Sequence, residues 1–420
     1  MEKQHSGRSS FSGKLGFVLS AAGASVGLGN IWRFPYLAAK YGGGIFLLIY
    51  ILLAVTFGYT MIMAETALGR MTRKSPVGAF AAFGKGRWRA FGGWINAVIP
   101  ILIVPYYSVI GGWVIKYLVG YITGHGSELA QDGYFSSFIA NGASVEIVFL
   151  LFTLLTLGII FAGVRNGVER VSRMMMPVLV VLSVIIAAYS VTRPGALEGV
   201  KYFLVPNPAN FSWMTVVTAM GQMFYSLSIA MGILVTFGSY MKKDVSIEGS
   251  TENVEIFDTL IAMMAGLMII PAVFSFSGGD PDTLQAGPAL MFITIPKVFE
   301  SMELGSLVGV LFFVLVLFAA VTSSIALTES VSQAGFRCGG GFHRANVFAL
   351  AQNGHAVRNR KHLMQLVGND DHGLAVRLHG PEHVEQLLRL LGGEDGGGFV
   401  QDQDVRPAVE HLDDLDGLLL

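Results

Sequence analysis

Cysteine and charge are the two features that this sequence has least of. Its single cysteine, Cys338, excludes an intramolecular disulfide and any metal cage built from cysteines. Only 14% of the 420 residues are charged and 53% are hydrophobic, a far more apolar composition than that of soluble domains. The formal net charge of −1 argues against a nucleic-acid partner. The composition predicts an integral membrane protein.

Long apolar runs, in contrast, are abundant. A helix that crosses a bilayer needs about 20 largely apolar residues. The N-terminus has no small-residue cleavage site after a short apolar core, so we expect no removable signal peptide. We expect an all-α polytopic membrane protein with eight spanning segments, the first and sixth interrupted: Ser12–Lys40, Gly44–Leu68, Phe91–Ile122, Val145–Ala162, Met174–Val191, Trp213–Met241, Ile256–Ser277 and Leu304–Leu327.

Basic residues are unevenly distributed between the expected loops. Residues 69–90 contain six basic residues and no acidic one, whereas residues 123–144 contain two acidic residues and no basic one. Arg165, Arg170 and Arg173 follow the fourth segment. By the positive-inside rule, the N-terminus (residues 1–13) and the region after the eighth segment lie in the cytoplasm. We therefore expect a multi-pass protein of the cell (inner) membrane.

The character of the chain changes near residue 335. Residues 335–420 contain no Trp or Tyr, no run long enough to span a bilayer, and seven of the nine histidines. One interpretation is a small soluble domain, and a second is a histidine metal site, although Pro381 between His379 and His383 disrupts a regular helical face. We favour a third, in which a frameshift, a fused gene fragment or a truncated reading frame gives a soluble tail that is disordered or artefactual.

The first interrupted segment contains the stretch AAGASVGLGNIWRFP, residues 21–35. Gly23 and Gly27 alone have the spacing of a face where two membrane helices pack closely. Gly29 and Asn30 extend the interruption, and Arg33 follows. Because an ionisable residue in a spanning segment is functional by default, the stretch predicts an unwound binding site.

The second interrupted segment places two hydroxyls and a glycine near its centre, in FYSLSIAMG, residues 224–232. Non-helical backbone at this depth persists only where it faces a cavity or buried protein. Paired glycine-interrupted segments in corresponding positions of two repeats indicate the binding site of a transporter.

Two broken helices supply a specific chemistry. Unwinding frees carbonyl oxygens that coordinate a small hard cation such as Na⁺, and half-helix N-termini attract a carboxylate. Asp258 in the seventh segment adds a fixed negative charge. Neutral hydroxyl ligands would come from Ser226, Ser228, Thr322 and Ser323. The pattern favours a zwitterionic substrate bound together with sodium.

Three stretches, AGASVGLGNIWRFP, GQMFYSLSIAMG and FAAVTSSIA, resemble motifs of the neurotransmitter:sodium symporter family, in particular its bacterial amino-acid transporters. The resemblance runs from about Phe11 to Ser332. It implies a fold of two five-helix inverted repeats with broken helices one and six, and transport by alternating access.

The resemblance also implies two sodium sites. The first would use the Ser25 carbonyl, the side chains of Asn30, Ser226 and Asp258, and the substrate carboxylate. Chloride-dependent members lack an acidic group here, so Asp258 implies that chloride is not required. The second site would use the carbonyls of Gly23, Val26 and Ala319 and the hydroxyls of Thr322 and Ser323.

A substrate pocket is implied in the same way. Tyr107 resembles the tyrosine that bonds the substrate carboxylate and the unwound backbone. Met231 replaces a phenylalanine that is frequent in leucine-preferring relatives, and nothing in the pocket pairs with a charged side chain, which favours large hydrophobic or aromatic amino acids. The implied pocket residues are Ser25, Leu28, Gly29, Ile103, Tyr107, Tyr225, Ser226, Ser228, Met231, Ser323 and Leu327.

Gating residues complete the resemblance. Tyr225 resembles an aromatic lid, and Arg33 and Gln222 resemble the outer gate. Glu65 resembles the carboxylate that braces the broken sixth helix. Arg8 and Phe11 resemble the inner latch, although Phe11 replaces the usual tryptophan.

The sequence departs from the family after Ser332. About eight of the family's roughly twelve spanning helices are present, and Arg337 stands where an acidic partner of the inner latch is expected. The leading function is sodium-coupled amino-acid symport. The alternative is a non-transporting fragment, or a binding or regulatory subunit that needs the missing helices in trans. No nucleophile–base pair or metal-ligand cluster appears in the membrane part, so we do not expect an enzyme.

Overall fold

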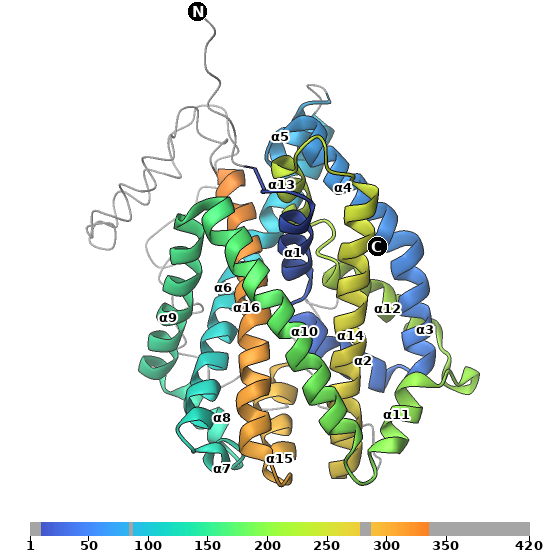
Figure 1. Ribbon diagram of the computed structural model, residues 1–420, viewed down its shortest axis with the longest axis vertical. Coiled ribbons are helices and arrows are strands. Elements are labelled where there is room, and N and C mark those ends of the chain that lie inside the picture. The colour runs from blue at the N-terminus through green and yellow to red at the C-terminus, as the bar shows by residue number, and fades with distance from the viewer. Residues whose placement is uncertain (1–9, 84–86, 278–286, 336–420) are drawn as a thin grey trace, which may run out of the picture. The chain divides into compact units, whose positions relative to one another are not determined.

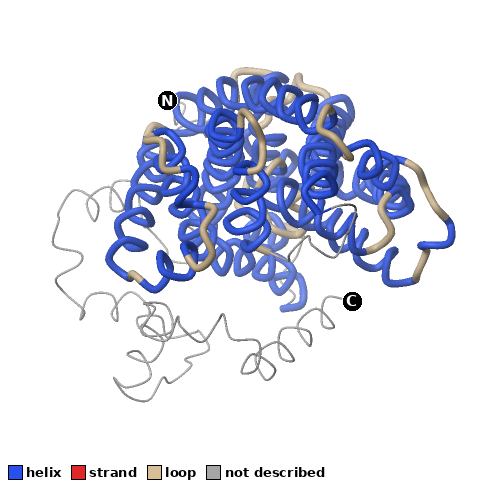
Figure 2. The backbone as a smooth tube through the Cα atoms, turned by 90° about the horizontal axis from the view of Figure 1, so that it is seen from below, coloured by secondary structure: helices blue, strands red, loops and turns tan. Residues whose placement is uncertain are grey.

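The computed structural model describes residues 10–83, 87–277 and 287–335 (Figure 1). Throughout these ranges the secondary structure is helical, and β-pairing is limited to one isolated antiparallel bridge between Gly43 and Pro206. Figure 2 shows the same residues as helices joined by loops. The expected all-α fold is confirmed.

The chain divides into two units. The first contains residues 1–134 and 147–337, and the second contains residues 135–146 and 338–420. The described part of the second unit holds most of α8 (Tyr134–Ala140) and the first residues of α9 (Gly142–Phe161). There the side chain of Asn141 accepts a hydrogen bond of 3.1 Å from the Ser144 N–H and so caps α9. The site and the cavities described below belong to the first unit.

Within the described residues, six helical stretches are long and apolar enough to cross a membrane: Gly44–Thr72, Phe91–Ile122, Gly142–Phe161, Val164–Val191, Glu248–Ser277 and Gly305–Ala334. A seventh consists of Lys14–Ser25 and Gly29–Lys40, which meet at a bend of 54°. The first expected interruption is therefore present, and the chain is a multi-pass membrane protein.

The sixth expected segment differs from a simple span. It consists of α12 (Trp213–Ser226) and α13 (Ile233–Tyr240), and neither is long enough to cross a membrane alone. Between them Ser228, Ala230 and Gly232 adopt positive φ angles of 55°, 62° and 67°. Left-handed backbone cannot continue a right-handed helix, so this segment is interrupted, as expected. Its break, between Ser226 and Ile233, is longer than the break between Ser25 and Gly29 in the first segment.

The fifth expected segment, Met174–Val191, begins earlier in the structure than expected. Arg165 lies in the π-helical turn η3 (Val164–Glu169), and Arg170 and Arg173 lie in α10 (Arg170–Val191). Arg173 is 3.6 Å from the carboxylate of Glu169. Arg173 is paired with an acidic side chain, and both Arg170 and Arg173 lie near the start of the helix. Basic residues can therefore be part of this spanning helix.

The remaining elements form the other spans and the connections between spans. The spans correspond to α3 (Gly44–Leu53), η2 (Ala54–Gly58), α4 (Tyr59–Thr72), α6 (Arg87–Ile122), α14 (Glu248–Ser277) and α16 (Gly305–Gly335). The connections contain α5 (Pro76–Ala81), α7 (Gly126–Leu129), α11 (Ala196–Leu204), η4 (Pro208–Asn210), η6 (Leu290–Thr294) and α15 (Ile295–Glu300).

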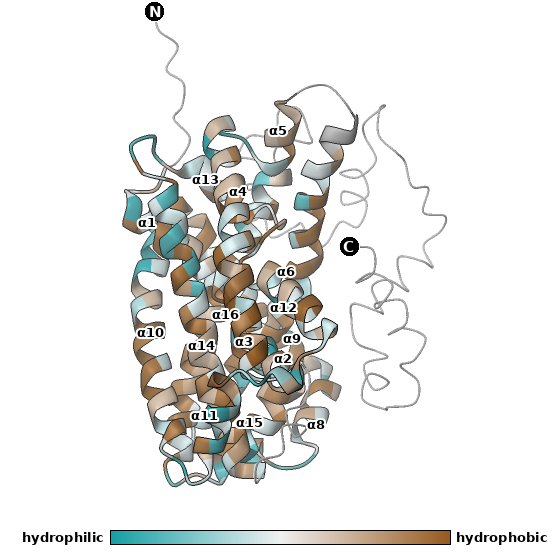
Figure 3. Cartoon of the chain, turned by 90° about the vertical axis from the view of Figure 1, so that its right-hand side faces the viewer, coloured by the Kyte–Doolittle hydropathy of each residue, from teal (hydrophilic) through white to brown (hydrophobic). Residues whose placement is uncertain are grey.

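The helix α16 forms the centre of the first unit. It packs against α6, α10 and the first broken helix α1 (Lys14–Ser25). Its most apolar window is 72% buried, whereas that of α9 is 17% buried. Figure 3 shows that apolar residues dominate the spanning helices along their length. Burial of α16 among other helices therefore places its TSS sequence (residues 322–324) inside the protein rather than against lipid.

Candidate functional site

The break in the first segment follows from competition for backbone N–H groups. The helix α1 ends at Ser25, and Val26 takes an extended conformation before η1 (Gly29–Arg33) and α2 (Phe34–Lys40) continue. The Gly27 N–H donates to Asn30 Oδ1 at 3.2 Å, and the Leu28 N–H donates to the Tyr107 hydroxyl at 3.0 Å. In a continuous helix these groups would bond the carbonyls of residues 23 and 24. Side chains have taken these donors, so the carbonyl oxygens of residues 23 and 24 have lost their helical partners and face side-chain hydroxyls instead.

One group of oxygens gathers where α1 meets α16. The hydroxyl oxygen of Ser323 lies 3.3, 3.1 and 3.2 Å from the carbonyl oxygens of Gly23, Ala24 and Val26. A hydroxyl has a single proton, so it serves one of these carbonyls at a time. The hydroxyl of the preceding residue, Thr322, lies 2.9 Å from the Phe318 carbonyl oxygen and 3.2 Å from that of Ala319. Buried neutral oxygens in excess of donors fit a small hard cation.

Asp258 forms a second group of oxygens. Its side chain accepts hydrogen bonds of 2.8 Å from Asn30 Nδ2 and from the Ser226 hydroxyl. The residue is fully buried, and in the described part of the chain no basic side chain forms an ion pair with it. An ionised carboxylate buried without a cation is costly, so this group also fits a bound cation.

Two further hydroxyl groups, of Tyr50 and Ser25, bear on this second group of oxygens. Tyr50 donates a hydrogen bond of 3.1 Å to the second oxygen of Asp258, and the sequence analysis did not assign it. Its only sequence signal is a phenol within the apolar run GIFLLIYILL, residues 44–53. The hydroxyl of Ser25 is buried and has no hydrogen-bond partner among the described residues, a state that costs about 1–3 kcal/mol and that a ligand would relieve.

A cavity lies between the two breaks. The space open to the centre of a water-sized sphere is about 30 Å³. No charged side chain lines it within the described residues. Its wall consists of Ala24, Ser25, Gly27, Gly29, Asn30, Ile103, Tyr107, Tyr225, Ser228, Met231, Ile233, Ser323 and Leu327.

Of the residues that the resemblance implied for the pocket, all but Leu28 and Ser226 line this cavity. Leu28 is buried with its N–H on the Tyr107 hydroxyl, and the Ser226 hydroxyl bonds Asp258. Asn30 was expected only as a cation ligand, and Ala24, Gly27 and Ile233 were not assigned.

Two glycines are required by close approach at this wall. A Cβ on Gly27 would lie 2.6 Å from the Ser323 hydroxyl oxygen and 2.8 Å from the Tyr107 hydroxyl oxygen. A Cβ on Gly29 would lie 2.3 Å from the ring of Tyr225. The glycines of the first break therefore make room for side chains of other helices.

The expected outer-gate residues meet around Tyr225. The guanidinium carbon of Arg33 lies 5.1 Å from the centre of the Tyr225 ring, within cation–π range. The side-chain amide of Gln222 donates to the Gly29 carbonyl at 3.2 Å. The hydroxyl of Tyr225 lies 3.0 Å from that of Tyr106, a partner that the sequence analysis missed.

Other side chains hold the interrupted sixth segment from the opposite side. Glu65 Oε1 accepts a hydrogen bond of 2.8 Å from the Ala230 N–H. Asn96 Oδ1, which the sequence analysis did not assign, accepts one of 3.1 Å from the Gly232 N–H. These contacts satisfy N–H groups that the left-handed turn leaves without helical partners.

The expected inner latch is described only in part. Arg8 lies outside the described residues. The N–H of Phe11 donates to the Tyr240 carbonyl at 3.2 Å, and the Phe11 ring packs edge-on against those of Phe17, Phe237 and Tyr240. The start of the chain's described part is thus attached to the second broken segment.

Comparison with known proteins decides the family. The model of the sodium:neurotransmitter symporter family matches residues 8–130 and 134–336. The chain belongs to this family. It is a family of transporters, not enzymes, and the match ends close to Ser332, where the resemblance of the sequence motifs stops.

Individual proteins that the chain resembles are also sodium-dependent transporters or a related transporter structure. The chain is 38% identical over 321 residues to the uncharacterized sodium-dependent transporter YhdH of Bacillus subtilis, an alignment that covers 76% of this chain and 70% of that protein. It is 33% identical over 339 residues to an uncharacterized sodium-dependent transporter of Haemophilus influenzae, covering 77% and 73%. The crystal structure of MhsT in complex with L-phenylalanine matches with a TM-score of 0.71 at 37% identity, covering 79% of this chain and 75% of MhsT.

Proposed function

We propose that this chain is a sodium-coupled symporter of a neutral hydrophobic or aromatic amino acid, working by alternating access. The observation that carries the proposal is the convergence of both helix breaks on one uncharged cavity, with freed carbonyls and Asp258 beside it. The similarity to MhsT, a structure with bound L-phenylalanine, supports the substrate class.

The two groups of oxygens would be the two sodium sites. The first would use Ser25, Asn30, Ser226 and Asp258, and the second would use Gly23, Val26, Ala319, Thr322 and Ser323. Bound Na⁺ would supply positive charge beside the substrate carboxylate and Asp258. Because Asp258 provides a fixed anion, we propose that transport does not require chloride.

The substrate would lie with its carboxylate toward Tyr107 and the first break. Its side chain would contact the apolar part of the wall, formed by Ile103, Met231, Ile233 and Leu327. A space of about 30 Å³ admits a water-sized group and not an aromatic side chain, so binding would require the wall to widen. Met231 and Tyr225 are the side chains that we expect to move, since methionine adapts its shape easily.

The remaining assigned residues would control access. Arg33, Gln222 and Tyr225 would close the outer side, and Glu65 would fix the left-handed turn of the sixth segment. Arg8 and Phe11 would close the inner side. The protein would lie in the inner membrane with residues 1–13 and the region after α16 in the cytoplasm.

A second candidate function follows from the extent of the family match. Aligned residues cover 70% of the Bacillus relative, and the match ends at residue 336. The chain would then be a non-transporting fragment, or a subunit that binds helices supplied in trans. The tail beyond residue 335, which lies outside the described residues, would be a frameshift or fusion product, and the DNA downstream of codon 332 tests that directly.

Uptake by proteoliposomes tests the proposed function. Labelled tryptophan, tyrosine or leucine should accumulate when an inward sodium gradient is imposed, and replacing chloride with gluconate should leave the uptake unchanged. Uptake that is independent of sodium would refute coupling. Sodium-dependent binding without accumulation would favour the second candidate function.

A further inference from the structure

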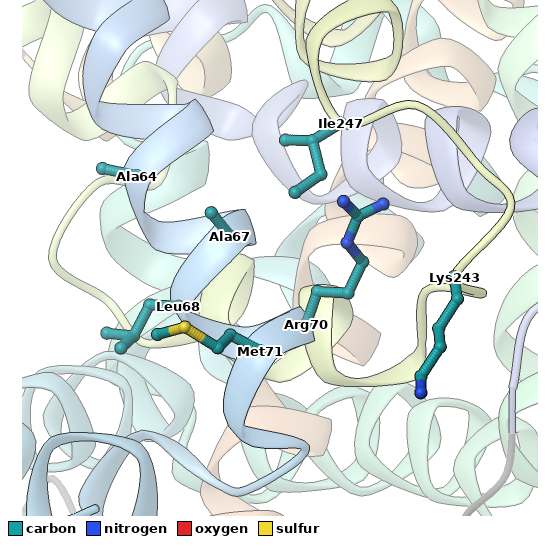
Figure 4. Close-up of a pocket in the computed structure, with 7 residues that line it drawn as sticks. All are labelled: Ala64, Ala67, Leu68, Arg70, Met71, Lys243 and Ile247. Atoms are coloured by element: carbon teal, nitrogen blue, oxygen red, sulfur yellow. The ribbon is translucent and has the colours of Figure 1, made fainter. Parts of the chain in front are cut away.

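A separate cavity lies outside the transport site, at the end of α4 (Figure 4). It is bounded on one side by α4 and on the other by the loop that leads from α13 to α14. The space open to the centre of a water-sized sphere is about 610 Å³, far more than in the cavity between the helix breaks. Its wall consists of Ala64, Ala67, Leu68, Arg70, Met71, Lys243 and Ile247.

The charged side chains in this wall are both basic. Arg70 donates a hydrogen bond through Nη1 to the carbonyl of Val245, which fixes its guanidinium beside the loop and leaves other N–H donors for a ligand. Lys243 is exposed, and in the described part of the chain it forms no ion pair. The nearby acids Asp244 and Glu248 do not line the cavity. Within the described residues, the wall of this cavity therefore holds two basic side chains and no acidic one.

The rest of the wall is an apolar stripe on a spanning helix. Ala64, Ala67, Leu68 and Met71 follow the spacing of one helical face, and Met71 is 67% exposed. The most apolar window of Gly44–Thr72 is only 33% buried, so part of this span is open to its surroundings. Leu48, Leu52 and Val55 of the same span are also exposed. The apolar stripe thus extends the exposed apolar surface of this span to the cavity, where Arg70 and Lys243 lie.

We propose that this cavity binds an anionic phospholipid. Its phosphate would contact Arg70 and Lys243, and an acyl chain would lie along Ala64, Ala67, Leu68 and Met71. Arginine binds phosphate through its planar fork, and basic pockets at the ends of membrane helices recognise anionic headgroups. A soluble anion would make no use of the apolar stripe, which favours a lipid over a free phosphate. A lipid here would join α4 to the loop that follows the second broken segment.

Photo-crosslinking tests the proposal on the full-length chain in nanodiscs. A phosphatidylglycerol with a diazirine in its acyl chain should label the peptide that contains Ala64–Met71. Lys243→Gln and Arg70→Gln should each lower that labelling about fivefold, the effect expected for one basic residue at a membrane surface. Lys74→Gln is the matched control, because Lys74 follows the same helix and does not line the cavity.

Each alternative has its own outcome. Equal labelling by a phosphatidylcholine analogue would refute a requirement for anionic charge. Loss of labelling when inorganic phosphate is added at constant ionic strength would indicate a soluble anion instead of a lipid. Labelling that survives both substitutions would overturn the assignment of Arg70 and Lys243. Lys243→Gln keeps the test valid if Arg70→Gln, which also removes the bond to Val245, fails to fold.

Discussion

The hydroxyls of Tyr106 and Tyr225 lie 3.0 Å apart, on two helices that otherwise border different sides of the cavity. Tyr225 lines the cavity, its ring rests against Gly29, and Arg33 lies over its other side. Tyr106 is 43% exposed. The hydrogen bond therefore joins the ring of Tyr225, which lines the cavity, to the partly exposed Tyr106 of α6. We expect this bond to restrict the movement of the Tyr225 ring.

Removing either hydroxyl should loosen this lid. We expect Tyr225→Phe and Tyr106→Phe each to speed substrate dissociation roughly two- to tenfold, since a hydrogen bond contributes about 0.5–1.5 kcal/mol. The double variant should resemble either single one, because both substitutions remove the same bond. Dissociation of labelled amino acid from purified protein measures this. Additive effects of the two substitutions would show that the hydroxyls act separately.

Asn30→Ala should weaken sodium-dependent binding. The substitution removes both the donor to Asp258 and the acceptor for the Gly27 N–H, and leaving a buried group without its partner costs about 1–3 kcal/mol. We expect the sodium concentration for half-maximal binding to rise about tenfold or more, and isothermal titration with sodium measures it. An unchanged sodium dependence would remove Asn30 from the first site.

Asp258→Ser should introduce a chloride dependence. The substitution removes the fixed negative charge beside Ser226 and Tyr50 and leaves their hydroxyls, with Asn30 Nδ2, as donors. A chloride ion can then supply the missing charge. Binding assays in chloride and in gluconate should differ for the variant and agree for the wild type. A wild-type protein that needs chloride would contradict the role given to Asp258.

Gly27→Ala should abolish amino-acid binding. Its Cβ would lie 2.6 Å from the Ser323 oxygen, so either the group of oxygens around Ser323 or the position of Tyr107 must change. Gly158→Ala is the matched control, since a Cβ there meets no atom within 4 Å and alanine favours a helix. Thermal unfolding of both variants separates loss of the site from loss of the fold. Normal binding by Gly27→Ala would show that the close approach is not required.

Residues of unusual type within apolar runs made the broken helices predictable from sequence. Glycine and asparagine at 27–30, and paired serines at 226 and 228, stand out because several of them gather within a few residues of an otherwise apolar span. Tyr50, Asn96 and Tyr106 were missed because each is an ordinary residue of its own helix. Only the packing of that helix against another reveals the atom it bonds.

Other contacts also depend on the tertiary structure. The resemblance implied Leu28 and Ser226 as pocket residues, and the structure adds that the Leu28 N–H bonds Tyr107 and that the Ser226 hydroxyl bonds Asp258. The fifth segment was expected to begin at Met174, but the helix begins earlier: Arg173 pairs with Glu169 one turn before it, and α10 contains both Arg170 and Arg173.

Equilibrium binding of labelled phenylalanine, measured against sodium concentration on purified protein, tests the central claim most directly. It needs no intact transport cycle, so it applies to the chain with or without further helices. The account predicts saturable binding that requires sodium, is unaffected by replacing chloride with gluconate, and is weakened by both Asn30→Ala and Ser323→Ala. Equal binding in sodium and in potassium would contradict it.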